Sequence, residues 1–186
     1  MIEATALLSS LDIYVDDSPL LTPSEMRGKA RRLHQEVGGL DMIILDYMQL
    51  MSGNSAGENR VQQMGEISRS LKGVARELDV PLMALSQLNR AVEQRTPHIP
   101  QLADLRESGS IEQDADVVMF ISREDAYITE EEWEKKFPTK RYPEGIANIY
   151  VAKHRNGPTG QVDLYFQKKT ATFYRDRKST RLNSSH

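Results

Sequence analysis

Apolar residues recur at helical spacing in some stretches of the chain. Residues 61–78 predict a long amphipathic helix, whose apolar positions are Val61, Met64, Ile67, Leu71, Val74, Ala75 and Leu78. A second helix is predicted over residues 22–37. Thr22 and Glu25 form a capping box there, with Pro23 at the first helical position and Gly38-Gly39 after its end. A charged helix is predicted over residues 129–137, with Trp133 and Phe137 on one face.

Short apolar runs predict the strands. Residues 42–45 and 80–85 are unbroken apolar runs, typical of buried parallel strands. Further strands are predicted at residues 11–15, 117–121, 145–155, 160–166 and 171–174, and residues 52–59 and 89–104 are predicted to be mostly loop. Alternating strands and helices followed by a hairpin predict an α/β fold with a mainly parallel sheet, flanking helices and a C-terminal antiparallel hairpin.

Composition places the chain among ordinary globular proteins and sets its class. With 186 residues, 39% apolar and 27% charged, it can form one domain. No apolar run approaches the roughly 20 residues of a membrane span, and no secretory signal is evident, so we expect a cytoplasmic protein without membrane association. The absence of cysteine excludes disulfides and thiolate metal sites, and the four scattered histidines do not predict a zinc site.

Charge is distributed unevenly along the chain. Residues 1–134 carry 12 Lys and Arg against 24 Asp and Glu, whereas residues 135–186 carry 12 against 3. The basic segment could bind a polyanion or simply be a solvated face. The last eleven residues, 176–186, are polar and aperiodic and match a translated sequencing-adapter peptide. We expect this tail to be disordered and artefactual, which leaves one domain over residues 1–175.

Two polar residues follow the predicted parallel strands. Asp46 comes at the end of the run 42–45, and the carboxyl edge of a parallel sheet is where such folds bind ligands. A single carboxylate there suits Mg²⁺, which also takes water and phosphate ligands, although an Asp can equally cap a turn. Gln87 follows the next strand, where its amide could contact a γ-phosphate and orient water, or merely face solvent.

Two further groups of residues could contact phosphate. Lys153 and Arg155 are two apart on a predicted strand, so both side chains leave the same face. They could stabilise charge on a transferring phosphoryl group, or protect an exposed sheet edge. Residues 106–116 form a polar run that could offer a guanidinium, hydroxyls and backbone N–H groups to phosphate, or be an ordinary surface loop before a strand.

Three motifs occur in the expected order of a known family. They are Leu85-Ser-Gln-Leu-Asn-Arg90, Arg106-Glu-Ser-Gly-Ser-Ile-Glu-Gln-Asp-Ala-Asp116 and Lys153-His-Arg-Asn-Gly-Pro158. Over residues 13–174 the chain thereby resembles the DnaB-type replicative DNA helicases, which are RecA-like ring ATPases. The resemblance implies a RecA-like fold, ATP and Mg²⁺ as cofactors, and a homo-hexamer that moves along single-stranded DNA. Primase and a helicase loader are the implied partners.

The resemblance also implies roles for individual residues. Asp46 falls on the family's Walker B position and would be the metal ligand. Gln87 matches the γ-phosphate-sensing Gln, and Lys153 and Arg155 match the fingers that reach the ATP of a neighbouring subunit. Arg106, Glu107 and Gly109 correspond to the loop that grips the backbone of one DNA strand.

One family motif does not occur in the chain. No G-x-x-x-x-G-K-[ST] sequence is present, so we expect the phosphate-binding loop, the catalytic Glu and the N-terminal domain to lie before residue 1, and this chain alone not to hydrolyse ATP. Two alternatives stay open. One is another RecA-like ATPase such as a recombinase, which would lack the Lys-x-Arg-Asn-Gly-Pro turn and form filaments. The other is a non-catalytic module that binds single-stranded DNA or docks a partner.

Overall fold

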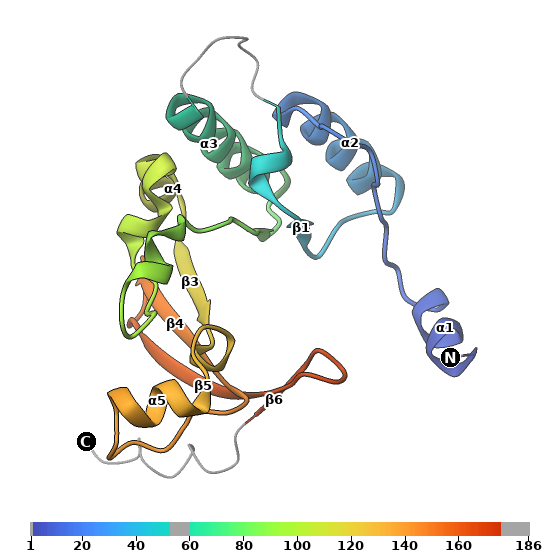
Figure 1. Cartoon of the computed structure of the whole chain (residues 1–186). Coiled ribbons are helices and arrows are strands. Elements are labelled where there is room, and N and C mark those ends of the chain that lie inside the picture. The colour runs from blue at the N-terminus through green and yellow to red at the C-terminus, as the bar shows by residue number, and fades with distance from the viewer. Residues whose placement is uncertain (1, 53–59, 176–186) are drawn as a thin grey trace.

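The chain forms two sheets joined by a helical layer (Figure 1). The structure is a computed structural model that describes residues 2–52 and 60–175, with the side chains of residues 2–5 and 106–109 excluded. The predicted loop at 52–59 therefore falls almost entirely outside the described residues, and the predicted disordered tail does so completely. The helices are α1 (Ile2–Ser9), α2 (Pro23–Glu36), α3 (Arg60–Leu78), α4 (Gly109–Asp114) and α5 (Glu130–Lys136), with short 3-10 helices η1 (Met48–Leu50), η2 (Arg90–Gln94), η3 (Leu102–Ser108) and η4 (Glu124–Ala126).

The first sheet contains the two predicted parallel strands. β1 (Ile43–Leu45) pairs with β2 (Leu82–Ala84), and Leu45 lies opposite Ala84 at their carboxyl ends. The strands are confirmed, but the prediction that they are buried is wrong for their outer face. Ile44 is 64% exposed and Met83 is 42% exposed. An unbroken apolar run can face a core on one side only, and no described element covers the other side.

The second sheet is antiparallel, with the strand order β3-β4-β5-β6. Its strands are β3 (Val117–Ser122), β4 (Ile146–His154), β5 (Gly160–Gln167) and β6 (Thr172–Arg175). The predicted strands and C-terminal hairpin are thus confirmed, as is the α/β fold class. Within the described residues the parallel part has two strands and the antiparallel part has four.

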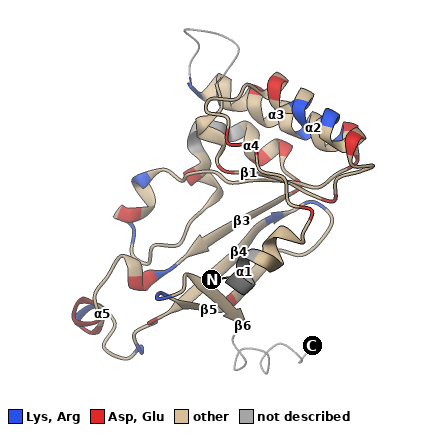
Figure 2. Cartoon of the chain, turned by 90° about the vertical axis from the view of Figure 1, so that its right-hand side faces the viewer, with Lys and Arg blue, Asp and Glu red and all other residues tan. Residues whose placement is uncertain are grey.

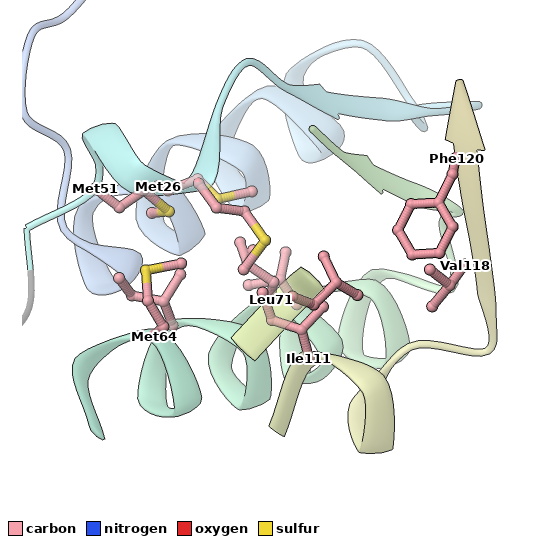
Figure 3. Close-up of a cluster of buried hydrophobic side chains, with 11 residues drawn as sticks. Met26, Met51, Met64, Leu71, Ile111, Val118 and Phe120 are labelled. Atoms are coloured by element: carbon pink, nitrogen blue, oxygen red, sulfur yellow. The ribbon is translucent and has the colours of Figure 1, made fainter. Parts of the chain in front are cut away.

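The main core lies along one face of α3, between the two sheets and α4 (Figure 3). Met64, Ile67, Leu71 and Val74 are buried as their spacing predicts, whereas Val61 is 43% exposed. The remaining buried members come from other elements: Met26, Met48, Met51, Leu105, Ile111, Val118 and Phe120.

The capping box predicted at Thr22 is confirmed, and α5 has a capping box that was not predicted. In both α2 and α5 the N-cap threonine, Thr22 or Thr129, accepts from the backbone N–H three residues later and receives the reciprocal carboxylate contact. The rings of Trp133 and Phe137 lie 4.5 Å apart, as predicted for one helix face. Beside α2, Glu77 of α3 binds two arginines of α2, and Figure 2 shows acidic and basic residues interspersed along this pair of helices.

Two predictions of local structure are wrong. Residues 11–15 form no strand: they are extended and exposed between α1 and α2, and no described strand lies beside them to complete hydrogen bonds. The polar run from residue 106 to 114 is helical rather than a loop, since η3 is followed directly by α4. Leu102, Leu105 and Ile111 explain this difference, because they pack on the core and turn the run into a buried helical layer.

Candidate nucleotide and DNA site

Asp46 and Gln87 lie at the same edge of the parallel sheet. Each follows the carboxyl end of its strand, and the strands run side by side with Leu45 opposite Ala84. Both residues are exposed, and neither side chain has a hydrogen-bond partner among the described residues. Asp46 therefore does not cap the turn that follows β1. Its carboxylate and the Gln87 amide are both free to meet a ligand at this edge.

Gln49, in η1, holds the strand ends together. Its side-chain oxygen accepts from the Gln87 N–H at 3.2 Å, and its Nε2 donates to the Gln87 carbonyl at 3.3 Å and to Ser86 Oγ at 3.0 Å. Arg60, at the start of α3, donates to the Gln49 carbonyl at 2.7 Å. The backbone at Gln87 is thus fixed relative to the end of β1 while its side chain stays free.

Lys153 and Arg155 converge on the last turn of α4. Lys153 Nζ donates to the carbonyls of Glu112 and Gln113, and Arg155 Nη2 donates to Gln113 O at 3.1 Å. These carbonyls belong to the end of a helix, where no intrahelical partner is available. The two cations thus contact the same turn, but the prediction that both lie on the strand is wrong for Arg155: β4 ends at His154, and Arg155 lies in the turn that follows. The alternative of an exposed sheet edge is wrong for Lys153, because β4 lies between β3 and β5.

Asp116 links Arg155 to α3. Its carboxylate forms an ion pair with Arg155, whose Nη1 lies 2.9 Å from Oδ1, and also binds Lys72. The hydrogen bond from Lys72 is the main reason that the pKa of Asp116 lies below its ordinary value, with Arg155 and Arg76 adding to the effect. Beside them is a hollow of about 250 Å³, lined by Arg69, Lys72, Gly73, Arg76, Gln113, Asp114 and Arg155. This face therefore collects basic side chains from α3 and from the turn after β4.

The segment matched to the DNA-gripping loop is helical in its backbone. Arg106, Glu107 and Ser108 end η3, and Gly109 begins α4. Their side chains are outside the described atoms, so the proposed DNA contacts stay predictions. What the structure places is the segment itself, at the end of α4 opposite the carbonyls that Lys153 and Arg155 contact.

Ionic and hydrogen-bonded contacts order the stretch between Gln87 and this segment. Asp104 is 4% exposed; it binds Arg95, accepts from the Gln101 N–H at 2.7 Å, and its own carbonyl accepts from the Asn89 N–H at 3.0 Å. Burial raises the pKa of Asp104, but the bonds from Arg95 and Gln101 outweigh it and leave the value lowered. Farther along, His98 Nδ1 lies 2.7 Å from Glu124 Oε2. The predicted loop at residues 89–104 is therefore held in place by ion pairs and hydrogen bonds.

The donor set at the sheet edge suits one kind of metal ion. No group of three or more His, Cys, Asp or Glu residues that could enclose a metal occurs among residues 2–52 and 60–175. Mg²⁺ keeps several water ligands and often takes one or two carboxylates beside substrate phosphates. The exposed, unpartnered carboxylate of Asp46 fits that requirement.

Comparison with known proteins supplies the family. The sequence pattern described as "DnaB-like helicase C terminal domain" matches residues 1–175. The chain belongs to this family. Curated relatives named "Replicative DNA helicase DnaB" include that of Geobacillus stearothermophilus, 50% identical over 91% of this chain, and that of Buchnera aphidicola, 49% identical over 90%. The chain spans about a third of the length of these relatives, at 35% and 34%.

Solved structures of DnaB-like proteins share the fold. One of them, described as an ATPase domain, has a TM-score of 0.83 and 36% identity, and the match covers 95% of this chain and 59% of that one. A DnaB-like replicative helicase, described with its interactions with primase, has a TM-score of 0.84 and 37% identity over 95% of this chain and 40% of its own. The RecA-like expectation is confirmed by these DnaB-like neighbours.

Three residues of the site carried no role in the sequence interpretation: Gln49, Lys72 and Asp116. Asp116 stands within the second family motif, but its partners come from α3 and the turn after β4 and could not be predicted from local spacing. Gln49 lies in the 3-10 helix η1 after β1, and its partners Ser86 and Gln87 are distant in the sequence. As for the membrane, none of the described helices is long and apolar enough to cross one.

Proposed function

We propose that the chain is part of the motor domain of a replicative DNA helicase, which moves along single-stranded DNA and unwinds duplex DNA by hydrolysing ATP. The observation that carries this proposal is the shared sheet edge of Asp46 and Gln87, with both side chains free. The family of the chain supports the same assignment.

Each site residue receives a role in this proposal. Asp46 would hold Mg²⁺ through its carboxylate, and the metal would neutralise charge on the ATP phosphates. Gln87 would contact the γ-phosphate and orient water through its free amide. Lys153 and Arg155 would act on the nucleotide of a neighbouring subunit. Within the described residues their side chains contact the last turn of α4 and Asp116, and neither contacts Asp46 or Gln87.

Arg106, Glu107 and Gly109 would hold the sugar-phosphate backbone of one DNA strand. Contact through an Arg and backbone N–H groups would be independent of base sequence. The parent protein would be a cytoplasmic homo-hexamer that works with a primase and a loader. One structural relative is described with primase, which supports that partner.

The test is a hybrid in which residues 1–175 replace the matching segment of the Geobacillus stearothermophilus relative. We expect rings in electron micrographs, ATP hydrolysis stimulated by single-stranded DNA, and duplex unwinding. Asp46→Ala should abolish hydrolysis in this hybrid. A filament instead of a ring would favour a recombinase, and folded rings that bind DNA without hydrolysing ATP would favour a non-catalytic module.

A further inference from the structure

Arg155 is held at three points by the end of α4 and the start of β3. Its Nη1 lies 2.9 Å from Asp116 Oδ1, its Nη2 donates to Gln113 O at 3.1 Å, and its backbone N–H donates to Asp116 O at 2.8 Å. Lys153 binds the same turn through the carbonyls of Glu112 and Gln113. We propose that Asp116 is a positioning residue, which together with these carbonyls orients Arg155 and Lys153 for action on a nucleotide. This inference rests on the proposed function.

The contacts leave the guanidinium available. A guanidinium has five N–H donors. One of those on Arg155 donates to Gln113 O, and Nη1 forms an ion pair with Asp116. The side chain of Arg155 is still 42% exposed. The guanidinium of Arg155 is therefore held by Asp116 and Gln113, and its remaining N–H groups can donate to a phosphate. Such preorganisation reduces the freedom that a long side chain must lose when it binds.

Stability alone does not explain this arrangement. Asp116 and Arg155 are 49% and 42% exposed, and ion pairs between exposed groups contribute little to folding. Lys72 makes a second ion pair to the same carboxylate, and its side chain is only 23% exposed. The lysine fixes Asp116 to α3, so the acceptor for Arg155 is itself oriented by the helix that carries the core.

The same turn is also connected to the segment matched to the DNA contacts. α4 has six residues and begins at Gly109, where that segment ends. A displacement of the segment would therefore move the carbonyls of Glu112 and Gln113, and with them the anchor of both cations. The positioning residue should for this reason influence how strongly DNA stimulates hydrolysis.

The experiment substitutes Asp116→Asn in the hybrid described above. We expect kcat for ATP to fall ~10- to 100-fold, since misplacement of a catalytic group by about 1 Å can cost 10²-fold. The stimulation by single-stranded DNA should shrink as well, while KM for ATP stays within about twofold because the nucleotide is bound by the other subunit. Asp116→Glu should recover part of the loss.

Asp16→Asn is the matched control. Asp16 forms an exposed ion pair with Lys29 at 2.7 Å, far from α4 in the sequence and outside the proposed site. It should leave kcat and DNA stimulation unchanged. Normal kcat and DNA stimulation in Asp116→Asn would overturn the inference, as would a loss of kcat that only matches a loss of folded protein.

A measurement on the 186-residue chain separates this inference from the proposed function. If the unsubstituted hybrid fails to hydrolyse ATP, the proposed function is wrong, and NMR of the arginine side chains decides the inference. The Arg155 guanidinium should be ordered in the parent chain and in Asp16→Asn, and averaged in Asp116→Asn. An Arg155 signal already averaged in the parent chain would refute the positioning role.

Discussion

The two pairs of candidate residues differ in how the chain supports them. Asp46 and Gln87 follow two strands that are exposed on one face, and their side chains have no partners among the described residues. Lys153 and Arg155 are fixed by carbonyls of α4 and, for Arg155, by Asp116. The side chains that would bind the chain's own nucleotide are thus without contacts. Those that would act on the nucleotide of a neighbouring subunit are held in place by hydrogen bonds and an ion pair. A side chain that extends across an interface loses conformational freedom when it binds, and contacts within its own subunit that already orient it reduce this cost.

The largest effect expected from this comparison is on the pair Lys153 and Arg155. In the hybrid ring, Arg155→Ala should lower DNA-stimulated hydrolysis by ~10³-fold or more, as removal of an arginine finger commonly does. Each subunit should still bind nucleotide, because the proposed binding residues are elsewhere. Steady-state hydrolysis and nucleotide titration measure the two properties separately.

Mixing subunits tests whether Arg155 acts across the interface. Arg155→Ala and Asp46→Ala subunits carry defects on opposite sides of a shared site, so some interfaces in mixed rings contain neither defect. Partial recovery of activity is expected over a range of ratios. If mixed rings form and show no recovery at any ratio, Arg155 does not act in trans.

The next test compares a buried isoleucine of α3 with an exposed isoleucine of β1, and measures how much each contributes to the free energy of unfolding. Ile67 on α3 is fully buried, and Ile67→Ala should lower the free energy of unfolding by about 2–5 kcal/mol. Ile44 on β1 is 64% exposed, so Ile44→Ala should change it by less than ~0.5 kcal/mol. Urea unfolding of the 186-residue chain gives both values. A large loss for Ile44→Ala would mean that the outer face of β1 is covered in the folded protein.

A smaller effect is expected at the proposed DNA contact. If Arg106 contacts a phosphate, Arg106→Ala should weaken single-stranded DNA binding about equally on all sequences. The slope of log affinity against log salt should decrease by ~0.7, the contribution of one neutralised phosphate. Arg141→Ala, at an exposed basic residue outside this segment, is the control and should leave the slope unchanged. A loss confined to one base sequence would indicate base contact instead.

The smallest expected effect is on the stability at low pH of the region around the antiparallel sheet, where Asp125 is buried. Burial raises the pKa of Asp125, but the hydrogen bonds from Lys168 and the Gly145 N–H and the charge of Arg123 hold it below its ordinary value. A lowered pKa stabilises the fold above the unfolded value of roughly 4, and this stabilisation is lost as pH falls through the folded pKa.

Trp133 is the only tryptophan and lies in α5, beyond η4, so its fluorescence reports on this region. Asp125→Asn should flatten the acid dependence of the Trp133 signal below pH ~4. The same dependence in both proteins would assign the acid response to other carboxylates.

Local sequence signals predicted the elements that depend on local physics. The capping box at Thr22, the apolar stripe of α3 and the strands of the C-terminal hairpin were all predicted from local spacing. The strand at 11–15 was predicted from composition, yet a strand also needs a neighbour to satisfy its backbone. The helical run at 102–114 was missed because its apolar residues are few and separated by polar ones, and only their packing on α3 reveals them.

The candidate site was predictable to a similar extent. Asp46 and Gln87 share an edge because parallel strands end together, which the order of the strands already implied. Asp116 and Gln49 could not be assigned in advance, since their roles depend on contacts between residues 37 to 44 positions apart. Long-range pairing of this kind is set by the tertiary fold and leaves no periodic signal.

The close approach of α4 to α3 at Gly65 restricts how α4 can move. A Cβ at Gly65 would lie 2.8 Å from Ser110 Oγ, so the side chain of Ser110 occupies the space that a larger residue at Gly65 would need. This close packing limits movement of α4 toward α3 and leaves lifting away from α3 or sliding along it. Lifting would expose Ile111, which is 8% exposed and packs in the core, whereas sliding would not. If α4 slides along α3 as a rigid helix, a displacement at its first residue would produce a displacement of similar size at its last turn.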